Sequence, residues 1–197
     1  MIQLSIPDTV ARINGILTNQ HHLVHYKLID VSNHPVSYYE LSYQERIQLL
    51  HGTNINQLCK SLLMVNHNYI VHPELTPQQH PRYVLVIIQY IARLHNDRLS
   101  KLVYNHISSQ SSCIRKNREY NWRLASENDN EHITGYINNA VTPFGLLQSV
   151  PIIISDTVAQ QCSTIYLGAG HVDLKLELDV NEYISKCNVL VGNVTYD

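Results

Sequence analysis

Apolar and polar side chains alternate most regularly over residues 172–178, where Val and Leu alternate with Asp, Lys and Glu. This period of two predicts a strand with one buried face and one wet face. A weaker alternation over residues 23–29 predicts a second strand. Unbroken apolar runs predict four more strands, at residues 61–65, 83–88, 151–154 and 163–167. The run at 83–88 is typical of a central strand that is buried on both faces.

Helices are predicted between these strands. Apolar side chains recur at three- and four-residue spacing over residues 6–17, which predicts a helix with one apolar stripe. Capping-box patterns predict helices that begin at Ser42 and at Asp179, and Asn96 and Asp156 can cap two more. Because helices and strands are mixed rather than regularly alternating, the pattern predicts one α+β domain with helices flanking a curved, mixed sheet.

Length and charge narrow the class of protein. A chain of 197 residues suits one domain, or one domain with an extension. Its formal net charge of −2 means that any contact with nucleic acid must be local. The basic cluster consists of Arg115, Lys116, Arg118 and Arg123, after a polar loop predicted at 108–116. We interpret it as part of a solvated loop, which is compatible with contact to nucleic acid.

Cysteine and histidine spacing gives no metal-binding pattern. The four Cys are scattered without a CxxC or Cys/His spacing, so we expect reduced thiols rather than a zinc site or a disulfide framework. We interpret His21, His22 and His25 as a solvated cluster. We therefore expect no metal and no cofactor. The sequence has no signal-peptide pattern and no run of about 18 apolar residues, which favours a cytoplasmic protein without a membrane segment.

Two segments are rich in turn-forming residues. Residues 133–145 read ITGYINNAVTPFG and predict a sharply bent loop with exposed main-chain N–H groups, which can bind a ligand. Residues 168–170 read GAG between two predicted strands, which indicates a hairpin or bulge where the backbone closely approaches another segment. His171 follows directly, and a hydrogen-bonded histidine is favoured over a general base there. Lys60 precedes the strand at 61–65, where a solvated lysine is favoured over a cation facing a cleft.

Four short motifs, in this order, resemble the YbaK / prolyl-tRNA synthetase-associated editing domain family. They are CKSLL at 59–63, ITGY at 133–136, VTPFG at 141–145 and LGAG at 167–170. The resemblance covers roughly residues 41–190 and is greatest to the free-standing eukaryotic branch. It implies a YbaK-like editing domain at 41–197 with a partly barrel-like mixed sheet. Residues 1–40 would be a branch-specific extension, a helix and a strand packed on that domain.

The resemblance also implies an activity. Family members hydrolyse the ester of mischarged aminoacyl-tRNA, so the expected function is that of a trans-acting deacylase for a small amino acid, on tRNA(Pro). Such a site needs no metal if a water is positioned and main-chain N–H groups meet the developing oxyanion. The expected partners are the acceptor end of aminoacyl-tRNA and a tRNA synthetase or synthetase complex.

Site residues carry over from the family by their motifs. Lys60 corresponds to the strand lysine that holds the substrate near the terminal adenosine. Asn139, Thr142 and Pro143 belong to the catalytic Gly-x-x-x-Pro loop, in which Asn139 stands where bacterial members usually carry Gly. Asn can adopt a left-handed turn at modest cost, and its side chain would rim the pocket. The expected substrate-binding residues are Thr134, Gly135, Gly145, Gly168, Ala169, Gly170 and His171.

A second hypothesis is a catalytically silent YbaK-like module that binds a tRNA synthetase or multisynthetase complex. The apolar stripe of residues 6–17 would then act as the adaptor. The presence of Lys60, Pro143 and Gly168 together favours the enzyme, because a decayed site would lose some of them.

Overall fold

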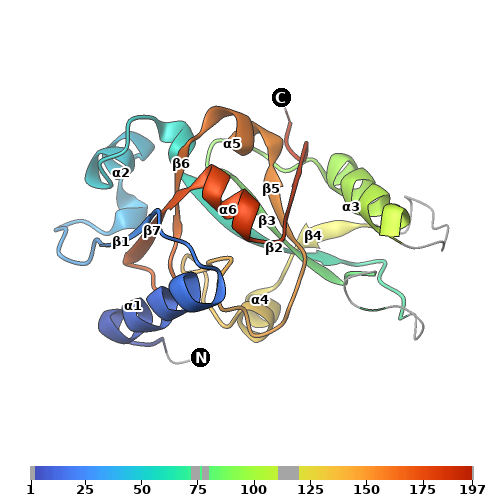
Figure 1. The fold of residues 1–197 in the computed structure, drawn as a ribbon, viewed down its shortest axis with the longest axis horizontal. Helices are drawn as coiled ribbons and strands as arrows, with labels where there is room; N and C mark the ends of the chain where they lie inside the picture. Colours follow the sequence, from blue (N-terminus) through green and yellow to red (C-terminus); the bar gives the residue numbers. More distant parts are fainter. Residues whose placement is uncertain (1–2, 72–75, 77–79, 111–119, 197) are drawn as a thin grey trace.

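The computed structural model describes residues 3–71, 76, 80–110 and 120–196. Its strands form two sheets with helices around them, and α2 and α3 lie at opposite ends of the long axis (Figure 1). The predicted α+β class with a mixed sheet and flanking helices is confirmed. The predicted partial barrel is not what the described strands form, because they divide into a sheet of three and a sheet of five.

The three-stranded sheet is antiparallel, in the order β1–β7–β6. Its strands are β1 (Tyr26–Asp30), β6 (Thr164–Gly168) and β7 (Leu174–Asp179). The alternation predicted for β7 buries its leucines completely. β1 begins three residues later than predicted, and Val24 before it is 68% exposed.

The five-stranded sheet has the order β4–β2–β3–β5–β8. Its strands are β2 (Cys59–Asn66), β3 (Tyr83–Gln89), β4 (Trp122–Leu124), β5 (Ile152–Ser155) and β8 (Val189–Gly192). β3 is the central strand, as predicted, and β5 and β8 run parallel to it. β2 pairs with β3 and β4 in antiparallel fashion. The short strands β4 and β8 were not predicted.

The helices of the described residues are α1 (Ile6–Gly15), α2 (Tyr43–Leu49), α3 (Asn96–Gln110), α4 (Glu127–Thr134), α5 (Asp156–Gln161) and α6 (Val180–Lys186). A π-helical turn (Ile16–Gln20) continues α1, and single 3-10 turns lie at Tyr38–Glu40 and Ile55–Gln57. None of the helices in the described ranges has the length and apolar character needed to cross a bilayer.

Several helix predictions are confirmed and others are corrected. The capping box at Ser42 is formed with Glu45 as predicted. The cap of α5 is Ser155, one residue before the predicted Asp156. α3 continues through residues 108–110, where a loop was predicted. α4 was not predicted, and it occupies the first two residues of the predicted loop at 133–145. The rest of the polar loop and most of the basic cluster lie outside the described residues.

The main core lies between the two sheets and under α1. Ile13 and Leu17 from the N-terminal helices are fully buried there against residues that include Leu176, Phe144 and Tyr183. A second apolar cluster unites α3 with the other face of the large sheet. The predicted apolar stripe of residues 6–17 is therefore occupied by the core and is not free to dock a partner. The predicted boundary at residue 40 stays a prediction.

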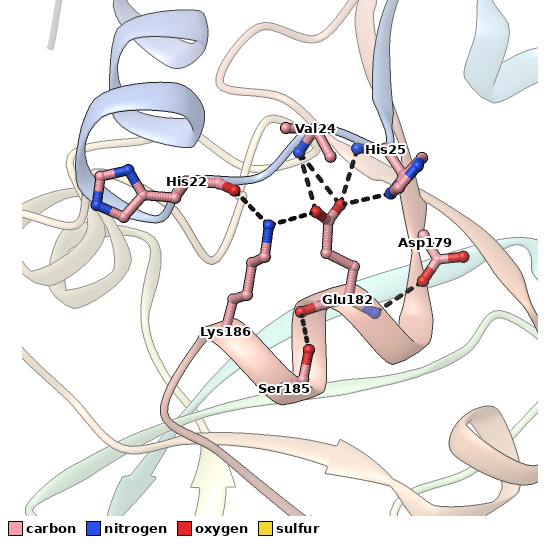
Figure 2. Close-up of polar contacts among 7 residues, drawn as sticks. All are labelled: His22, Val24, His25, Asp179, Glu182, Ser185 and Lys186. Carbon is pink, nitrogen blue, oxygen red and sulfur yellow. Dashed lines mark hydrogen bonds and ion pairs between the residues drawn. The ribbon is translucent and has the colours of Figure 1, made fainter.

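Glu182 ties the N-terminal segment to α6 (Figure 2). The capping box predicted at Asp179 is only half formed: Asp179 accepts the Glu182 N–H at 2.7 Å, but the Glu182 carboxylate points elsewhere. It accepts the main-chain N–H groups of Val24 at 3.1 Å and His25 at 2.8 Å, and the Lys186 Nζ at 2.7 Å. These bonds take up the N–H groups of Val24 and His25, so β1 begins only at Tyr26.

The environment of Glu182 favours its charged form. Burial alone would raise its pKa, but the hydrogen bonds from Lys186, His25 and Val24 outweigh burial and lower the pKa to about 2. The name "Glu182 clamp" is used below for Glu182, Lys186 and the main chain of residues 22–25.

Candidate functional site

A cavity of about 580 Å³ opens beside the first half of β2. It is walled by β2, by the start of α4, by the loop after α4 and by the end of β6. The lining residues are Tyr39, Cys59, Lys60, Ser61, Leu62, Leu63, Tyr90, Leu124, Ala125, Ser126, Glu127, Asn130, Asn138, Asn139, Val141 and Gly168. Ligand cavities in proteins are commonly of about this size, roughly 300–1,000 Å³.

The open edge of β2 forms one wall of this cavity. Leu58 and Asn66 are hydrogen-bonded to β3, so by antiparallel alternation the peptide groups of Ser61 and Leu63 point to the other edge. The Leu63 carbonyl accepts the Ala125 N–H at 2.9 Å, and Leu58 forms a bridge to β6 on the other side. Ser61 lies in the gap between these two contacts. Its Oγ is buried and has no hydrogen-bond partner among the described residues.

Lys60 supplies a cation to the cavity. Its Nζ donates to the Tyr90 carbonyl at 3.2 Å and lies 6.0 Å from the centre of the Tyr90 ring. Partial burial lowers the pKa of Lys60. An ammonium carries three donors, so this contact leaves donors for a carbonyl or phosphate oxygen of a ligand. The structure thus places Lys60 at the wall of a cavity rather than at a fully solvated position.

Asn139 forms the tip of the loop that faces the cavity. Its φ of 67° is left-handed, as the sequence predicted for an Asn in place of Gly. The Asn139 carbonyl accepts a hydrogen bond from the Tyr39 hydroxyl at 2.5 Å. The neighbouring Asn138 donates its side-chain amide to the Glu127 carboxylate at 2.8 Å. The loop is therefore held from both sides, by Tyr39 and by the first turn of α4.

The hairpin between β6 and β7 docks on the same loop through its backbone. A side chain at Gly168 would place its Cβ 2.6 Å from the Val141 carbonyl oxygen, which is too close for any other residue without a shift. The Gly170 N–H donates to the Ala140 carbonyl at 2.8 Å. The close backbone approach predicted for residues 168–170 is confirmed.

The predicted catalytic residues lie at different depths. Lys60 and Asn139 line the cavity, whereas Thr142 and Pro143 are buried behind the loop. The Thr142 Oγ1 is buried without a hydrogen-bond partner in the described part of the chain. Thr142 and Pro143 therefore shape the loop from behind, and their part in catalysis stays a prediction.

Of the predicted substrate-binding residues, Gly168 lines the cavity and Ala169 is buried beside it. Thr134 donates to the Asn130 carbonyl at 2.6 Å inside α4. Gly135 and Gly170 line a separate cavity of about 300 Å³ next to α1. The part of these residues in substrate binding stays a prediction.

The last two predicted residues, Gly145 and His171, are engaged in other contacts. The Gly145 carbonyl accepts a hydrogen bond from the Arg12 guanidinium at 2.8 Å, and Gly145 has a left-handed φ of 66°. The His171 Nδ1 accepts the Asp173 N–H at 3.1 Å. This agrees with the interpretation of His171 as a hydrogen-bonded histidine.

Sequence reasoning missed a group of aromatic and basic side chains next to the cavity. The Arg46 guanidinium lies 5.2–5.5 Å from the ring centres of Tyr38, Tyr39, Tyr43 and Tyr90. Burial raises the pKa of Tyr90. The signal that could have pointed to such a group is composition, because the chain has 13 Tyr and only 1 Phe.

Lys175 was misjudged from the pattern of β7. The alternation placed it on a wet face, but the residue is only 2% exposed. The other face of β7 at this position is covered by the 3-10 turn at residues 38–40, which supplies the rings of Tyr38 and Tyr39. Strict alternation cannot reveal such a cover, because the covering segment is far away in the sequence.

Comparisons with known proteins agree with this fold. Residues 114–186 match the family model of the aminoacyl-tRNA editing domain. A search of curated proteins gave no match. A solved structure described as a candidate trans-editing enzyme for prolyl tRNA synthetase is similar, with a TM-score of 0.70 and 15% identity, over 98% of this chain and 99% of that one. The hypothetical protein APE2540 is similar with a TM-score of 0.66 and 18% identity, over 95% of this chain and 99% of that one.

These findings define the class of the protein. At such low identity the solved structures show the fold, which is shared over nearly the whole chain. The family match covers the second half of the cavity wall, including α4, the Asn139 loop and the β6–β7 hairpin. Residues 114–186 are similar to the aminoacyl-tRNA editing domain family, which bears out the resemblance found in the motifs.

Proposed function

We propose that this protein is a trans-acting aminoacyl-tRNA deacylase of the cytoplasm that hydrolyses the ester of a small amino acid mischarged on tRNA(Pro). The observation that carries the proposal is that Lys60 and Asn139, 79 positions apart in the sequence, line one cavity beside the open edge of β2. The match to the editing-domain family supports the reaction class. The solved neighbour described as acting for prolyl tRNA synthetase supports the choice of tRNA.

Binding would rest on a few directed contacts rather than on a broad positive field. The cavity has room for a nucleoside with a small acyl group. Lys60 would hold a phosphate or carbonyl oxygen of the acceptor end with the donors that Tyr90 leaves unused. The net charge of −2 fits a protein that grips only the end of the tRNA.

Hydrolysis would proceed by attack of a water on the ester carbonyl, which transfers negative charge to the carbonyl oxygen. Main-chain N–H groups that already point into the cavity can stabilise this charge without reorganising, and the N–H of Ser61 at the open edge of β2 is one such group. The vicinal ribose hydroxyl of the substrate would move the proton to the leaving oxygen. The products are the free amino acid and the uncharged tRNA.

The walls of the cavity support the choice of a small amino acid. Val141 and Leu63 line the cavity next to the loop, and a pocket of fixed walls rejects larger side chains more effectively than smaller ones. Editing sites that act as a second sieve use this principle. The second sieve would admit Ala, Ser or Cys and exclude Pro.

The test is a hydrolysis panel with Ala, Cys, Ser and Thr, each on tRNA(Pro) and on its cognate tRNA. Lys60→Ala is compared with Lys101→Ala, which removes an exposed lysine from α3. We expect one small amino acid on tRNA(Pro) to be released fastest, and we expect Lys60→Ala to lower kcat/KM by about 100-fold or more, since a charged contact to the substrate is lost. Lys101→Ala should behave as wild type.

Two results would overturn the proposal. Full activity in Lys60→Ala would remove Lys60 from the site. An absence of hydrolysis for every tRNA, with a folded protein, would favour the silent module that binds a tRNA synthetase or multisynthetase complex. That module would need another surface than the stripe of α1, because Ile13 and Leu17 are buried in the core.

A further inference from the structure

A buried lysine lies behind the loop that faces the cavity. The Lys175 Nζ donates to the Val172 carbonyl at 2.6 Å and to the Tyr39 hydroxyl at 3.1 Å. It also lies 4.3 Å from the ring centre of Tyr38 and 4.6 Å from that of Tyr39. The ammonium is thus held by one carbonyl, one hydroxyl and two π faces, and cations bind favourably to such faces.

The Tyr39 hydroxyl links this lysine to the loop. A phenol has one hydrogen to donate, and an ammonium can only donate. Because Tyr39 accepts from Lys175, its own hydrogen can be donated to the Asn139 carbonyl at 2.5 Å, with the Tyr90 side chain as a second neighbour of the same hydroxyl. The polar chain therefore runs in one direction, from Lys175 through Tyr39 to Asn139, and it ends at the left-handed residue that lines the cavity.

Packing alone does not explain the lysine. Taking an ammonium out of water is costly unless it is fully compensated. The pKa of Lys175 is lowered to about 7, chiefly by burial; the Asp173 carboxylate opposes this shift and the Arg46 guanidinium from α2 adds to it. Asp173 is itself shared with His171, whose Nδ1 lies 3.9 Å from it. An apolar side chain of similar length would fill the same space without this cost.

We propose that Lys175 is a positioning residue of the editing cavity, which acts through the Tyr39 hydroxyl to hold the Asn139 carbonyl and so keeps the loop in the conformation that meets the substrate. This inference rests on the proposed function for its effect on catalysis. The restraint on the loop itself is independent of any substrate. The name "Lys175 relay" is used below for Lys175, Tyr39 and the Asn139 carbonyl.

The experiment breaks the relay at each end. Lys175→Met removes the donor, and Tyr39→Phe removes the hydroxyl but keeps the ring over the lysine. Hydrogen exchange of the amides of residues 138–141 is measured in the free protein, and kcat and KM are measured on the best substrate of the panel. We expect each variant to raise the exchange of these amides about tenfold and to lower kcat about tenfold, as the loss of one hydrogen bond to the loop implies.

The coupling between the Lys175 and Tyr39 variants distinguishes a positioning role of Lys175 from a merely structural one. If Lys175 acts through Tyr39, the double variant should be no worse in kcat than either single variant. Lys175→Arg, which keeps a donor, should recover part of kcat. The ratio of wild-type to Lys175→Met activity should fall as pH rises from 6 to 8.5, because Lys175 loses its charge and the hold on Tyr39 weakens.

The outcomes distinguish the two proposals. Unchanged exchange at 138–141 and unchanged kcat in both single variants would overturn the relay while leaving the deacylase proposal in place. Additive losses in the double variant would also overturn it, since the residues would then act separately. If wild-type protein hydrolyses no tRNA, the deacylase proposal fails, and the exchange measurement alone decides the relay. Should Lys175→Met not fold, Tyr39→Phe carries the same test.

Discussion

The Glu182 clamp and the Lys175 relay both use a buried charged side chain to hold a distant segment of main chain. They differ in whether the surroundings favour or disfavour the charged form of that side chain. Glu182 is met by an ammonium and by two N–H groups, so its pKa falls and its charged form is favoured (Figure 2). Lys175 is met by a carbonyl, a hydroxyl and two rings, and its pKa falls as well. For a base, a lowered pKa means that the charged form is disfavoured.

From this difference we infer that the charge of Glu182 stabilises the fold, whereas the charge of Lys175 positions the wall of the cavity. The Glu182 clamp joins the N-terminal segment to α6, and none of its residues lines the cavity. The Lys175 relay ends at the Asn139 carbonyl in the cavity wall. Sites that hold a ligand are often maintained at a cost in stability, because groups are oriented for the ligand rather than for one another. The comparison therefore predicts that removing the two charges has opposite effects on stability.

The largest effect is expected for Glu182→Gln. The amide cannot accept from Lys186 and both main-chain N–H groups as a carboxylate does, so the free energy of unfolding should fall by about 1–3 kcal/mol. Denaturant unfolding at pH 7 measures this change, with Glu40→Gln, an exposed carboxylate, as the control. Activity per folded molecule should be unchanged.

The pH dependence of this variant sharpens the comparison. Since the native pKa of Glu182 is lowered to about 2 from an ordinary value near 4.5, the clamp contributes its full stability above about pH 4.5 and loses it as the pH falls toward 2. The loss of stability between these values should be smaller in Glu182→Gln than in wild type. Equal slopes would mean that the clamp does not depend on the charge.

An effect of opposite sign is expected for Lys175→Met. The native pKa near 7 lies below the ordinary value of 10.5, so the unfolded chain binds a proton more readily between these values. Wild-type stability should therefore rise with pH from about 7 to 10.5, and this rise should be smaller in the variant. At pH 7 the variant should be as stable as wild type or more stable, by up to about 1–2 kcal/mol. A measurable loss of stability at pH 7 would make Lys175 a stabilising residue and break the comparison.

The smallest effect is expected for Ser61→Ala. The Ser61 Oγ is buried at the open edge of β2 without a partner in the described ranges, so its removal leaves no other group unpaired. The free energy of unfolding should change by less than about 0.5 kcal/mol or rise slightly, while kcat/KM should fall several-fold if the hydroxyl meets the substrate. Ser100→Ala, a buried serine of α3 away from the cavity, is the control. Lost stability with full activity would place Ser61 with the fold rather than with the cavity.

The predictions from the sequence succeeded mainly where the interactions join residues that are close together in the chain. The alternation of β7 and the apolar run of β3 were found because burial of a strand repeats every one or two residues. The capping box of Ser42 and Glu45 was found because both partners lie within one helical turn. The motifs also led to Lys60, Asn139 and Gly168, which the structure brings to one cavity.

Other predictions failed where a distant segment competed for a local partner. Asp179 and Glu182 have the spacing of a capping box, but the carboxylate of Glu182 instead accepts from the main chain of Val24 and His25, 158 and 157 residues away. The stripe of α1 has the pattern of a docking helix, but the core of the same chain already covers it. A local pattern shows which contacts are possible, and the free energy of the whole fold decides which of them form.

The sequence by itself determined the α+β class, most strands, the helix at Ser42, the left-handed turn at Asn139 and the family. Each of these depends on neighbours in the chain or on motifs that can be read directly. Only the tertiary structure decided that Lys175 is buried and joined to Tyr39, 136 residues away, and that β2 leaves an open edge at Ser61. The physical reason is that burial and long-range hydrogen bonds are properties of the packed chain. Segments far apart in the sequence exclude water from each other's polar groups only when the fold brings them into contact.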